Sequence, residues 1–445
     1  MLKLPKVFSD GMILQRDVPV RIWGEADQPV TVSIDMHSAV DFHRNGKFSL
    51  EIPPHEAGGP YTMFIECGGE IIKLHDVYFG DVILAGGQSN MALELSCTLE
   101  SDSDQSLDES ESVVRMFTVS GESENGRSVE GRDVWLEVNM ENAKYISAVA
   151  SHCAHAVSKA QNVPIGVISC NSGGSSIRSW ISPETVASDP MFDCHTIWHF
   201  EVYRYGFNTA SYLYKQKLLC VAPYNISAVI WYQGESDVAD NSAYSYAHLF
   251  ELLMADWRKL FRNDSLQFIF AQISYGPPRR DHEVWYIIRE QQLKLHLNDN
   301  GAHMITTGDV GDHYDLHPND KKTVGNRYAL AVRHILYGED VESRPPVCTE
   351  MIVENNVAVL KFADVGDGLY ADAPLEFKGL SVKGHPFNGE YEICGDVIRV
   401  WCEGIIPAVV SFCFENDVEV HLYSSSGLPA SPFRIAVRES LAIGD

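Results

Sequence analysis

The sequence lacks any hydrophobic run that approaches the roughly 18 residues a membrane-spanning helix needs, so we expect no membrane segment. Basic residues are also scarce, since 34 lysines and arginines face 61 acidic residues and leave a net charge of −27. That balance disfavours binding to nucleic acid or to an anionic membrane surface. Ten cysteines are present, but none forms the Cys-x-x-Cys pair that suggests zinc or redox chemistry.

The opening residues, 1–6, lack the apolar core of a secretion signal. We therefore expect a cytoplasmic protein with reduced thiols, or a secreted one if a leader has been removed. Hydrophobic residues make up 45% of the chain and charged residues 21%, which is typical of a globular protein. A length of 445 residues suggests two or three domains, and the composition gives no indication of the oligomeric state.

Local patterns divide the chain into three regions. Residues 1–76 have the pattern of short strands separated by turns, which predicts a small β-sandwich. The region has no catalytic cluster, so we expect a packing module, and the alternative is a sugar-binding module. Residues 77–340 alternate strands and helices, which predicts a parallel sheet with helices on both faces. Strand patterns return in residues 341–445 and predict a second β domain, which we expect to pack against the first and bring the two termini together.

The central region supplies the clearest secondary-structure signals. Several apolar runs are predicted as buried strands: 82–85, 165–169, 228–232, 268–273 and 303–307. Helical periodicity marks 148–159, 244–260 and 323–336.

Residues 86–91, Gly-Gly-Gln-Ser-Asn-Met, are the most informative stretch of the chain. A predicted strand leads into them, the two glycines permit a tight turn, and good helix formers follow. A serine on such a strand-to-helix turn is held outside the sheet, near backbone N–H groups that can bind an anion. Ser89 is therefore a candidate nucleophile for acyl transfer, and the alternative is a serine that caps a helix.

Polar, glycine-containing segments also follow three other predicted strands. Ligands bind at the carboxyl ends of parallel strands, so we expect these segments to meet Ser89 at one edge of the sheet. The segments are 171–175, 233–237 and 308–318.

Roles can be assigned to residues within these segments. His317 is the candidate base for Ser89, and Asp315 is the carboxylate expected to orient it, with Asp312 in reserve. The alternative for His317 is a surface histidine. The predicted oxyanion donors are the backbone N–H groups of Ser89, Gly173 and Gly174 and the side-chain amide of Gln233. Gln233 has its own alternative, a buried amide that ties two loops together. We assign substrate contacts to Gln88, Asn90, Arg178, Trp180, Glu235 and Tyr314.

Two features could indicate a metal site. Residues 98–112 are rich in Ser, Asp and Glu but lack an EF-hand pattern, so we expect a solvated loop. Several histidines are spaced so that a helix could present them to one metal ion, but they do not form a recognised metal-binding motif. We therefore predict neither a metal nor a cofactor. The histidines and the nearby aspartate are His152, His155, Asp193, His195 and His199.

Together these motifs resemble the sialate O-acetylesterase family of SGNH-type hydrolases. The family typically has Gly-Gln-Ser-Asn-Met, Trp-Tyr-Gln-Gly-Glu-Ser-Asn and Asp-Ile-His-Pro, and this chain has matching blocks at 87–91, 231–237 and 315–318. The likeness extends from an opening at 4–16 to an ending at 427–434.

The resemblance implies a fold and an activity. It implies a flavodoxin-like, three-layer SGNH domain with a parallel sheet, flanked by β-sandwich-like segments. It also implies hydrolysis of O-acetyl esters on sugars without metal or cofactor. The triad carried over is Ser89, Asp315 and His317, and the oxyanion donors are the Gly173 loop and Gln233.

Departures from the family pattern leave the substrate open. Asp237 stands where asparagine is usual, and Tyr314 stands where broader SGNH hydrolases have the aspartate. Arg178, in a block that also differs from the family, would read a substrate carboxylate or pair with a local acid. O-acetylated sialic acid and neutral sugars such as acetylated xylo-oligosaccharides are both candidate substrates. The competing class is a non-catalytic carbohydrate-binding protein, and the intact Ser89, Gln233 and His317 argue against it.

Overall fold

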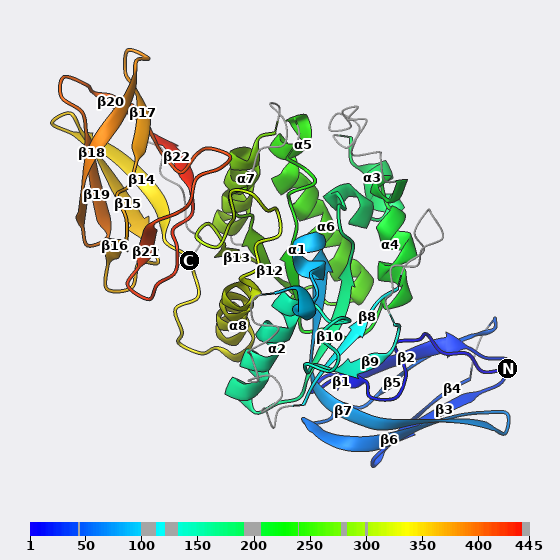
Figure 1. The fold of residues 1–445 in the computed structure, drawn as a ribbon. Helices are drawn as coiled ribbons and strands as arrows, with labels where there is room; N and C mark the ends of the chain where they lie inside the picture. Colours follow the sequence, from blue (N-terminus) through cyan, green and yellow to red (C-terminus); the bar gives the residue numbers. More distant parts are fainter. Residues whose placement is uncertain are drawn as a thin grey trace.

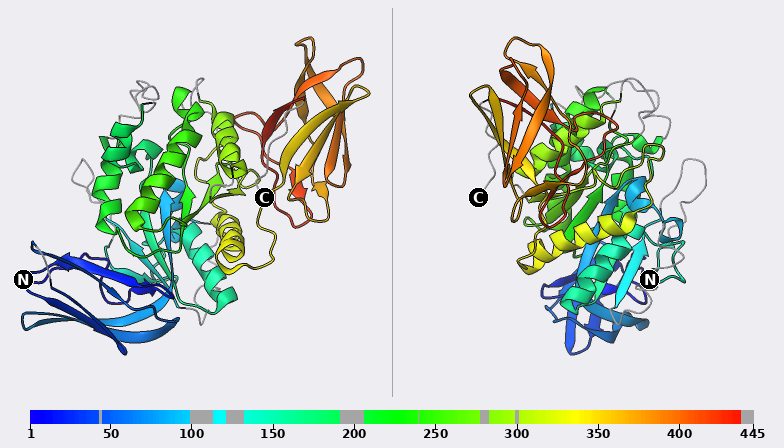
Figure 2. Two further views of the ribbon diagram at one scale, coloured as in Figure 1. Left: turned by 180° about the vertical axis from the view of Figure 1, so that it is seen from behind. Right: turned by 60° about the vertical axis from the view of Figure 1, so that its left-hand side comes forward.

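A central α/β domain separates two β regions in the computed structural model (Figure 1). The structure describes residues 1–42, 45–98, 113–120, 132–190, 206–238, 240–276, 283–298 and 301–437. The N-terminal and C-terminal β regions lie on opposite sides of the central domain, which Figure 2 shows from two further directions. The expectation that these two regions pack together is therefore wrong.

The described strands of the central sheet are parallel apart from the edge strand β9. Their order is β13-β12-β11-β7-β10-β8-β9, so the chain runs first to one side of β7 and later to the other. Apart from the first half of β7 and the edge strand β9, nearly all of their residues are buried, which fits strands covered on both faces. The strands are β7 (Glu70–Gly87), β8 (Val114–Thr118), β9 (Trp135–Glu137), β10 (Ile165–Asn171), β11 (Ala228–Tyr232), β12 (Gln267–Gln272) and β13 (Ala302–Thr306).

Helices cover both faces of this sheet. The Trp231 ring stacks on Phe250 of α6, whereas Lys321 of α8 lies over the ring of the next residue, Tyr232. Neighbouring residues of a strand point to opposite faces, so α6 and α8 lie on opposite sides. The helices are α2 (Ala148–Gln161), α3 (Pro183–Ser188), α4 (Tyr212–Gln216), α5 (Asp240–Tyr244), α6 (Tyr246–Phe261), α7 (Trp285–Leu297) and α8 (Lys321–Tyr337), with 3-10 turns η1 (Leu95–Cys97), η3 (Ile177–Trp180), η6 (Gly206–Asn208) and η7 (Leu218–Cys220).

Strand β7 belongs to two sheets. Its first half pairs with β6 and β1 of the N-terminal region, and its second half pairs with β10 and β11 of the central sheet. The boundary expected after residue 76 thus falls inside a continuous strand. The other strands of the N-terminal region are β1 (Ile13–Gln15), β2 (Val20–Glu25), β3 (Val30–Ile34), β4 (His37–Asp41), β5 (Lys47–Ile52) and β6 (Gly58–Cys67).

The C-terminal region is an antiparallel sheet in the order β14-β15-β19-β18-β17-β20-β22, with a separate β16-β21 pair. No helix in the described part of the chain is both long and apolar enough to cross a membrane. The nine cysteines that the structure describes are free thiols. The strands of this region are β14 (Val347–Glu354), β15 (Val357–Ala363), β16 (Leu369–Ala371), β17 (Phe377–Ser381), β18 (Pro386–Cys394), β19 (Val397–Trp401), β20 (Pro407–Phe412), β21 (Leu422–Ser424) and β22 (Phe433–Ala436).

The end of β7 requires glycine at position 87. Gly87 has a φ of +127°, and a Cβ there would lie 2.1 Å from the carbonyl oxygen of Tyr232. We expect Gly87→Ala to lower the free energy of unfolding by about 3 kcal/mol or more, because the neighbouring strand must move. Gly46→Ala is the matched control, since Gly46 has a φ of +76° with open space around it, and it should cost about 1 to 2 kcal/mol. Urea denaturation of both variants tests this, and equal losses would contradict the steric argument.

Candidate active site

The strand-to-helix turn after β7 presents Ser89. Gln88 occupies the N-cap position of α1 (Ser89–Ala92) and its side chain makes no capping hydrogen bond, so Ser89 is not the helix cap that the sequence left as an alternative. Helix α1 is a single turn, shorter than the sequence pattern suggested, so the aligned dipoles of a long helix are absent. Ser89 is partly exposed, and its hydroxyl has no hydrogen-bond partner among the described residues.

The loop after β10 lies directly beside Ser89. The N–H of Ser172 donates to the carbonyl oxygen of Gly87 at 3.0 Å, and a Cβ on Gly173 would lie 3.6 Å from Ser89 Cβ. The next carbonyl, of Gly174, accepts from Asn208 Nδ2 at 2.9 Å and so holds the loop. Within the described ranges the N–H groups of Ser89 and Gly173 donate to no acceptor. Unengaged donors beside a nucleophile are what an oxyanion requires.

Asn90 connects this turn to the histidine loop. Its Nδ2 donates to the carbonyl oxygen of Leu316, the residue before His317, at 3.0 Å and to Glu235 Oε1 at 2.6 Å. Its Oδ1 accepts from Lys321 Nζ at 2.8 Å. The residue next to Ser89 is therefore bonded to the residue next to His317. Because Asn90 is buried and fully engaged, the structure contradicts its assignment as a substrate contact.

Of the two candidate carboxylates, the structure brings Asp315 to the histidine. Asp315 Oδ1 accepts from the backbone N–H of His317 at 2.9 Å and lies 3.7 Å from its Nδ1. Asp312 Oδ1 instead accepts from the N–H groups of Tyr314 and Asp315, at 2.7 and 3.1 Å, and so shapes the turn. His317 and Asp315 are both substantially exposed, with side-chain exposures of 39% and 58%.

The C-terminal β region supports the loop that carries His317. The N–H of Val420 donates to the carbonyl oxygen of Gly308 at 2.9 Å, and Asp417 Oδ1 lies 2.8 Å from His313 Nδ1. Arg327 of α8 binds Asp309 through both carboxylate oxygens, at 2.7 and 2.6 Å. The loop is thus held at its start and middle by groups outside the sheet.

Gln233 is wholly buried and its amide is engaged. Nε2 faces three acceptors, Asp237 Oδ2 at 2.6 Å, the carbonyl oxygen of Ser175 at 3.0 Å and Gln88 Oε1 at 3.2 Å. Oε1 accepts from the hydroxyl of Tyr246 at 2.8 Å. An oxyanion role would require one of these bonds to be exchanged, so the geometry favours the alternative of a buried amide that ties loops together.

Glu235 lies on the same loop and acts through Asn90. Burial raises the pKa of the Glu235 carboxyl, while the hydrogen bond from Asn90 and the positive charge of Lys321 oppose that rise. Its Oε2 has no hydrogen-bond partner among the described residues. Glu235 is therefore a buried carboxyl that positions the Asn90 amide. Contact with substrate, as the sequence suggested, would have to involve that second oxygen.

The structure buries two residues that were expected to contact substrate. Trp180 is 0% exposed, packs edge-on against Trp231 and Trp257, and donates to Ser175 Oγ at 3.1 Å. Arg178 is 3% exposed, and its positive charge opposes the rise that burial causes in the pKa of Asp237. The structure contradicts both assignments, because these side chains are buried and support the loop from inside.

Two further predicted contacts have different surroundings. Gln88 is also buried, and its Oε1 accepts from the N–H of Ser236 at 3.1 Å, so it too belongs to the internal network. Tyr314 has the opposite placement, since its side chain is 95% exposed on the loop that carries His317. Of the residues assigned to substrate, Tyr314 is the one whose side chain is fully accessible.

Lys321 is a residue of the site that was not predicted from the sequence. This lysine begins α8, is fully buried, and bonds Asn90 across the site. One signal was available, because a cation in the first turn of a helix is disfavoured by the helix dipole. A lysine in the first turn of a helix therefore suggests a specific partner, which here is Asn90.

No group of three or more His, Cys, Asp or Glu suited to a metal ion occurs among the residues that the structure describes. His152 and His155 are buried in α2, and His155 Nε2 hydrogen-bonds the carbonyl oxygen of Val138 at 2.9 Å. The other considered histidines, with Asp193, and nearly all of the acidic segment 98–112 lie outside the described residues.

Comparison with known proteins agrees with these features. The model of a family described as carbohydrate esterase, sialic acid-specific acetylesterase, matches residues 79–334, more than half of the chain. Human sialate O-acetylesterase is 25% identical over 375 residues, which cover 74% of this chain and 70% of that protein. The mouse sialate O-acetylesterase is 25% identical over 399 residues, with 74% and 72% covered.

A solved structure extends the likeness to the whole architecture. The crystal structure of a carbohydrate acetylesterase from Xanthomonas citri is 28% identical, covers 98% of this chain and 99% of its own, and has a TM-score of 0.85. The match therefore includes both β regions as well as the central domain. The chain belongs to the sialic acid-specific acetylesterase family of carbohydrate esterases, and it is a carbohydrate acetylesterase.

Proposed function

We propose that the protein is a serine esterase that releases acetate from O-acetylated carbohydrates through an acetyl-enzyme on Ser89. The central domain is then of the SGNH type, with flavodoxin-like layering. One observation carries the proposal. The Ser89 hydroxyl and the Gly173 N–H lie side by side with no hydrogen-bond partner among the described residues, and the histidine loop is bonded to the adjacent Asn90. Base, nucleophile and oxyanion donors thus come from three loops at one edge of the sheet.

The proposed reaction has two halves. Ser89 Oγ attacks the acetyl carbonyl carbon while His317 takes the hydroxyl proton, and the carbonyl oxygen becomes an oxyanion stabilised by the N–H groups of Ser89 and Gly173. His317 then gives the proton to the sugar oxygen, which leaves as an alcohol. Water attacks the acetyl-serine with His317 again as base, and acetate departs. Asp315 orients the histidine and stabilises its protonated form.

The sugar is a separate question. The first candidate substrate is an O-acetylated sialic acid, because the chain is similar to proteins named sialate O-acetylesterase. A second candidate, a neutral acetylated xylo-oligosaccharide, is favoured by the burial of Arg178 near Asp237, because this guanidinium is then not presented to a substrate carboxylate. Acetate release measured across O-acetylated sialic acids, xylo-oligosaccharides and manno-oligosaccharides distinguishes the two.

Removing the nucleophile should abolish turnover without disturbing the fold. We expect Ser89→Ala to lower kcat by a factor on the order of 10⁴ to 10⁶, measured with a chromogenic acetyl ester. Ser96→Ala is the matched control, because Ser96 is exposed a few residues further along and should be replaceable without loss. Near-normal turnover by folded Ser89→Ala protein would remove Ser89 from the mechanism.

Substitution of the two aspartates should affect kcat very differently. Asp315→Asn should lower kcat by up to about 10⁴, because the histidine loses the carboxylate that sets its tautomer. Asp312→Asn should be much milder, since an amide oxygen can still accept from the N–H groups of Tyr314 and Asp315. Turnover rates of both variants on one acetyl ester decide the matter, and greater damage from Asp312→Asn would reverse the assignment.

Gln233 is expected to act mainly on stability. Gln233→Ala should lower the free energy of unfolding by about 1 to 3 kcal/mol, because Asp237 and Tyr246 each lose a buried partner. The exposed Gln216→Ala serves as control and should be neutral. Unchanged stability together with a kcat loss of roughly 10² to 10³ would instead assign Gln233 to the oxyanion hole.

A further inference from the structure

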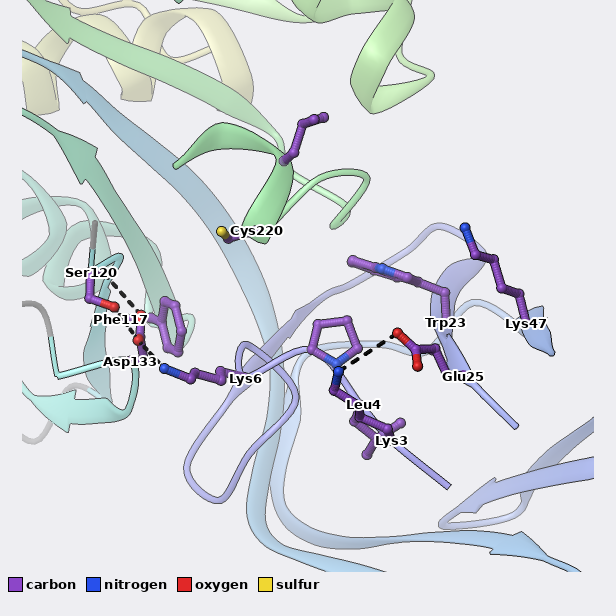
Figure 3. A pocket seen from close by; sticks show the side chains of 13 residues that line it. Lys3, Leu4, Lys6, Trp23, Glu25, Lys47, Phe117, Ser120, Asp133 and Cys220 are labelled. Carbon is purple, nitrogen blue, oxygen red and sulfur yellow. Dashed lines mark hydrogen bonds and ion pairs between the residues drawn. The ribbon is translucent and has the colours of Figure 1, made fainter. Parts of the chain in front are cut away.

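A cavity of about 630 Å³ lies between the N-terminal β region and the edge of the central domain. Figure 3 shows side chains from the N-terminal segment, β2, β5, the end of β8 and η7 converging on it. Its volume is in the range of small-molecule sites, which often form between domains. None of the residues assigned to the reaction at Ser89 lines it.

One wall of the cavity is apolar and fixed in place. Trp23 packs edge-on against Phe8, with ring centroids 4.6 Å apart, and against Tyr224, with centroids 6.4 Å apart. These contacts hold the indole, which remains partly exposed on the cavity side. Leu219 also lines the cavity and is 45% exposed. Such a surface suits the apolar face of a ring.

The charges of the lining favour an anion. Lys6 Nζ lies 2.6 Å from Asp133 Oδ2, and Lys3 Nζ lies 3.7 Å from Glu25 Oε1, so these lysines are paired (Figure 3). Lys47 has no ion-pair partner among the described residues and leaves the described part of the lining with one net positive charge. In a chain with a net charge of −27, that is a local reversal of sign.

The cavity is equipped for binding rather than for reaction. Cys220 supplies the thiol in the lining, and its Sγ donates to the carbonyl oxygen of Gln216 at 3.3 Å. Histidine is absent from the described lining, so no base of that type stands beside the thiol.

We infer that this cavity is a second, non-catalytic carbohydrate site that takes a saccharide carrying a carboxylate. The sugar ring would lie against Trp23, and Lys47 would pair with the carboxylate. A saccharide follows from the family, whose members act on carbohydrates, and the carboxylate follows from the unpaired lysine. The inference does not depend on the serine mechanism at Ser89.

Glucuronic acid and glucose are suitable probes, because they differ in the carboxylate alone. Binding to the full chain is measured by ligand-observed NMR titration. We expect glucuronic acid to bind about tenfold more tightly than glucose, Lys47→Glu to abolish that preference, and Trp23→Ala to weaken binding of both. Lys383→Glu, at an exposed turn of the C-terminal region, is the charge-matched control and should bind as the wild type does.

Acetyl-ester turnover of the same variants separates this site from the reaction. Turnover should be unchanged in Lys47→Glu and Trp23→Ala. If the serine mechanism is wrong, Ser89→Ala will keep its turnover, and the sugar-binding results will not be affected. Equal binding of the two sugars, no binding of either, or unaltered glucuronic acid binding by Lys47→Glu would overturn the inference. Lys47 is exposed, so its variant should fold even if Trp23→Ala does not.

Discussion

The continuity of β7 is the constraint on which the rest of the structure depends. One 18-residue strand pairs with the N-terminal β region and then forms the middle of the central sheet. It ends at Gly87, packed so closely against Tyr232 that only glycine fits. The serine that follows is therefore fixed relative to both β10 and β11. The chain also changes direction in the sheet at β7, the place where open α/β sheets bind ligands.

From that turn, a buried polar network reaches the other loops. Asn90 binds the backbone before His317, the carboxyl of Glu235 and the ammonium of Lys321. The adjacent Gln88 joins Gln233 in a second cluster. Buried polar groups are costly unless they are paired, so each bond also restrains the loop that supplies its partner. The groups proposed to react, Ser89 and the His317–Asp315 pair, are left accessible.

Much of this arrangement could be predicted from local sequence. Buried strands and the helices near 148–159, 244–260 and 323–336 follow from hydrophobic period, and glycine with polar residues marks the strand ends. Helix α7 was not predicted, because its buried face includes Arg289, Gln291 and Gln292 and so its apolar period is weak. The predicted domain boundary at residue 76 falls within β7, because a strand that pairs with two sheets gives no break in pattern.

Individual side chains were harder to predict than the loops that carry them. Arg178 and Trp180 follow the correct strand, but both are buried, and Trp180 packs against Trp257, which is far along the chain. The role of Lys321 was not predicted for the same reason, since its partner Asn90 is 231 positions away. Local patterns give the position of a residue along a strand or loop, whereas its orientation depends on packing between distant segments.

The central claim is that Ser89 is an activated nucleophile, and covalent labelling with a fluorophosphonate tests it most directly. The account predicts stoichiometric loss of acetylesterase activity and a single phosphonyl adduct, located by peptide mass spectrometry on the peptide that contains Ser89. Full activity without an adduct, or inactivation by an adduct on another residue, would contradict it.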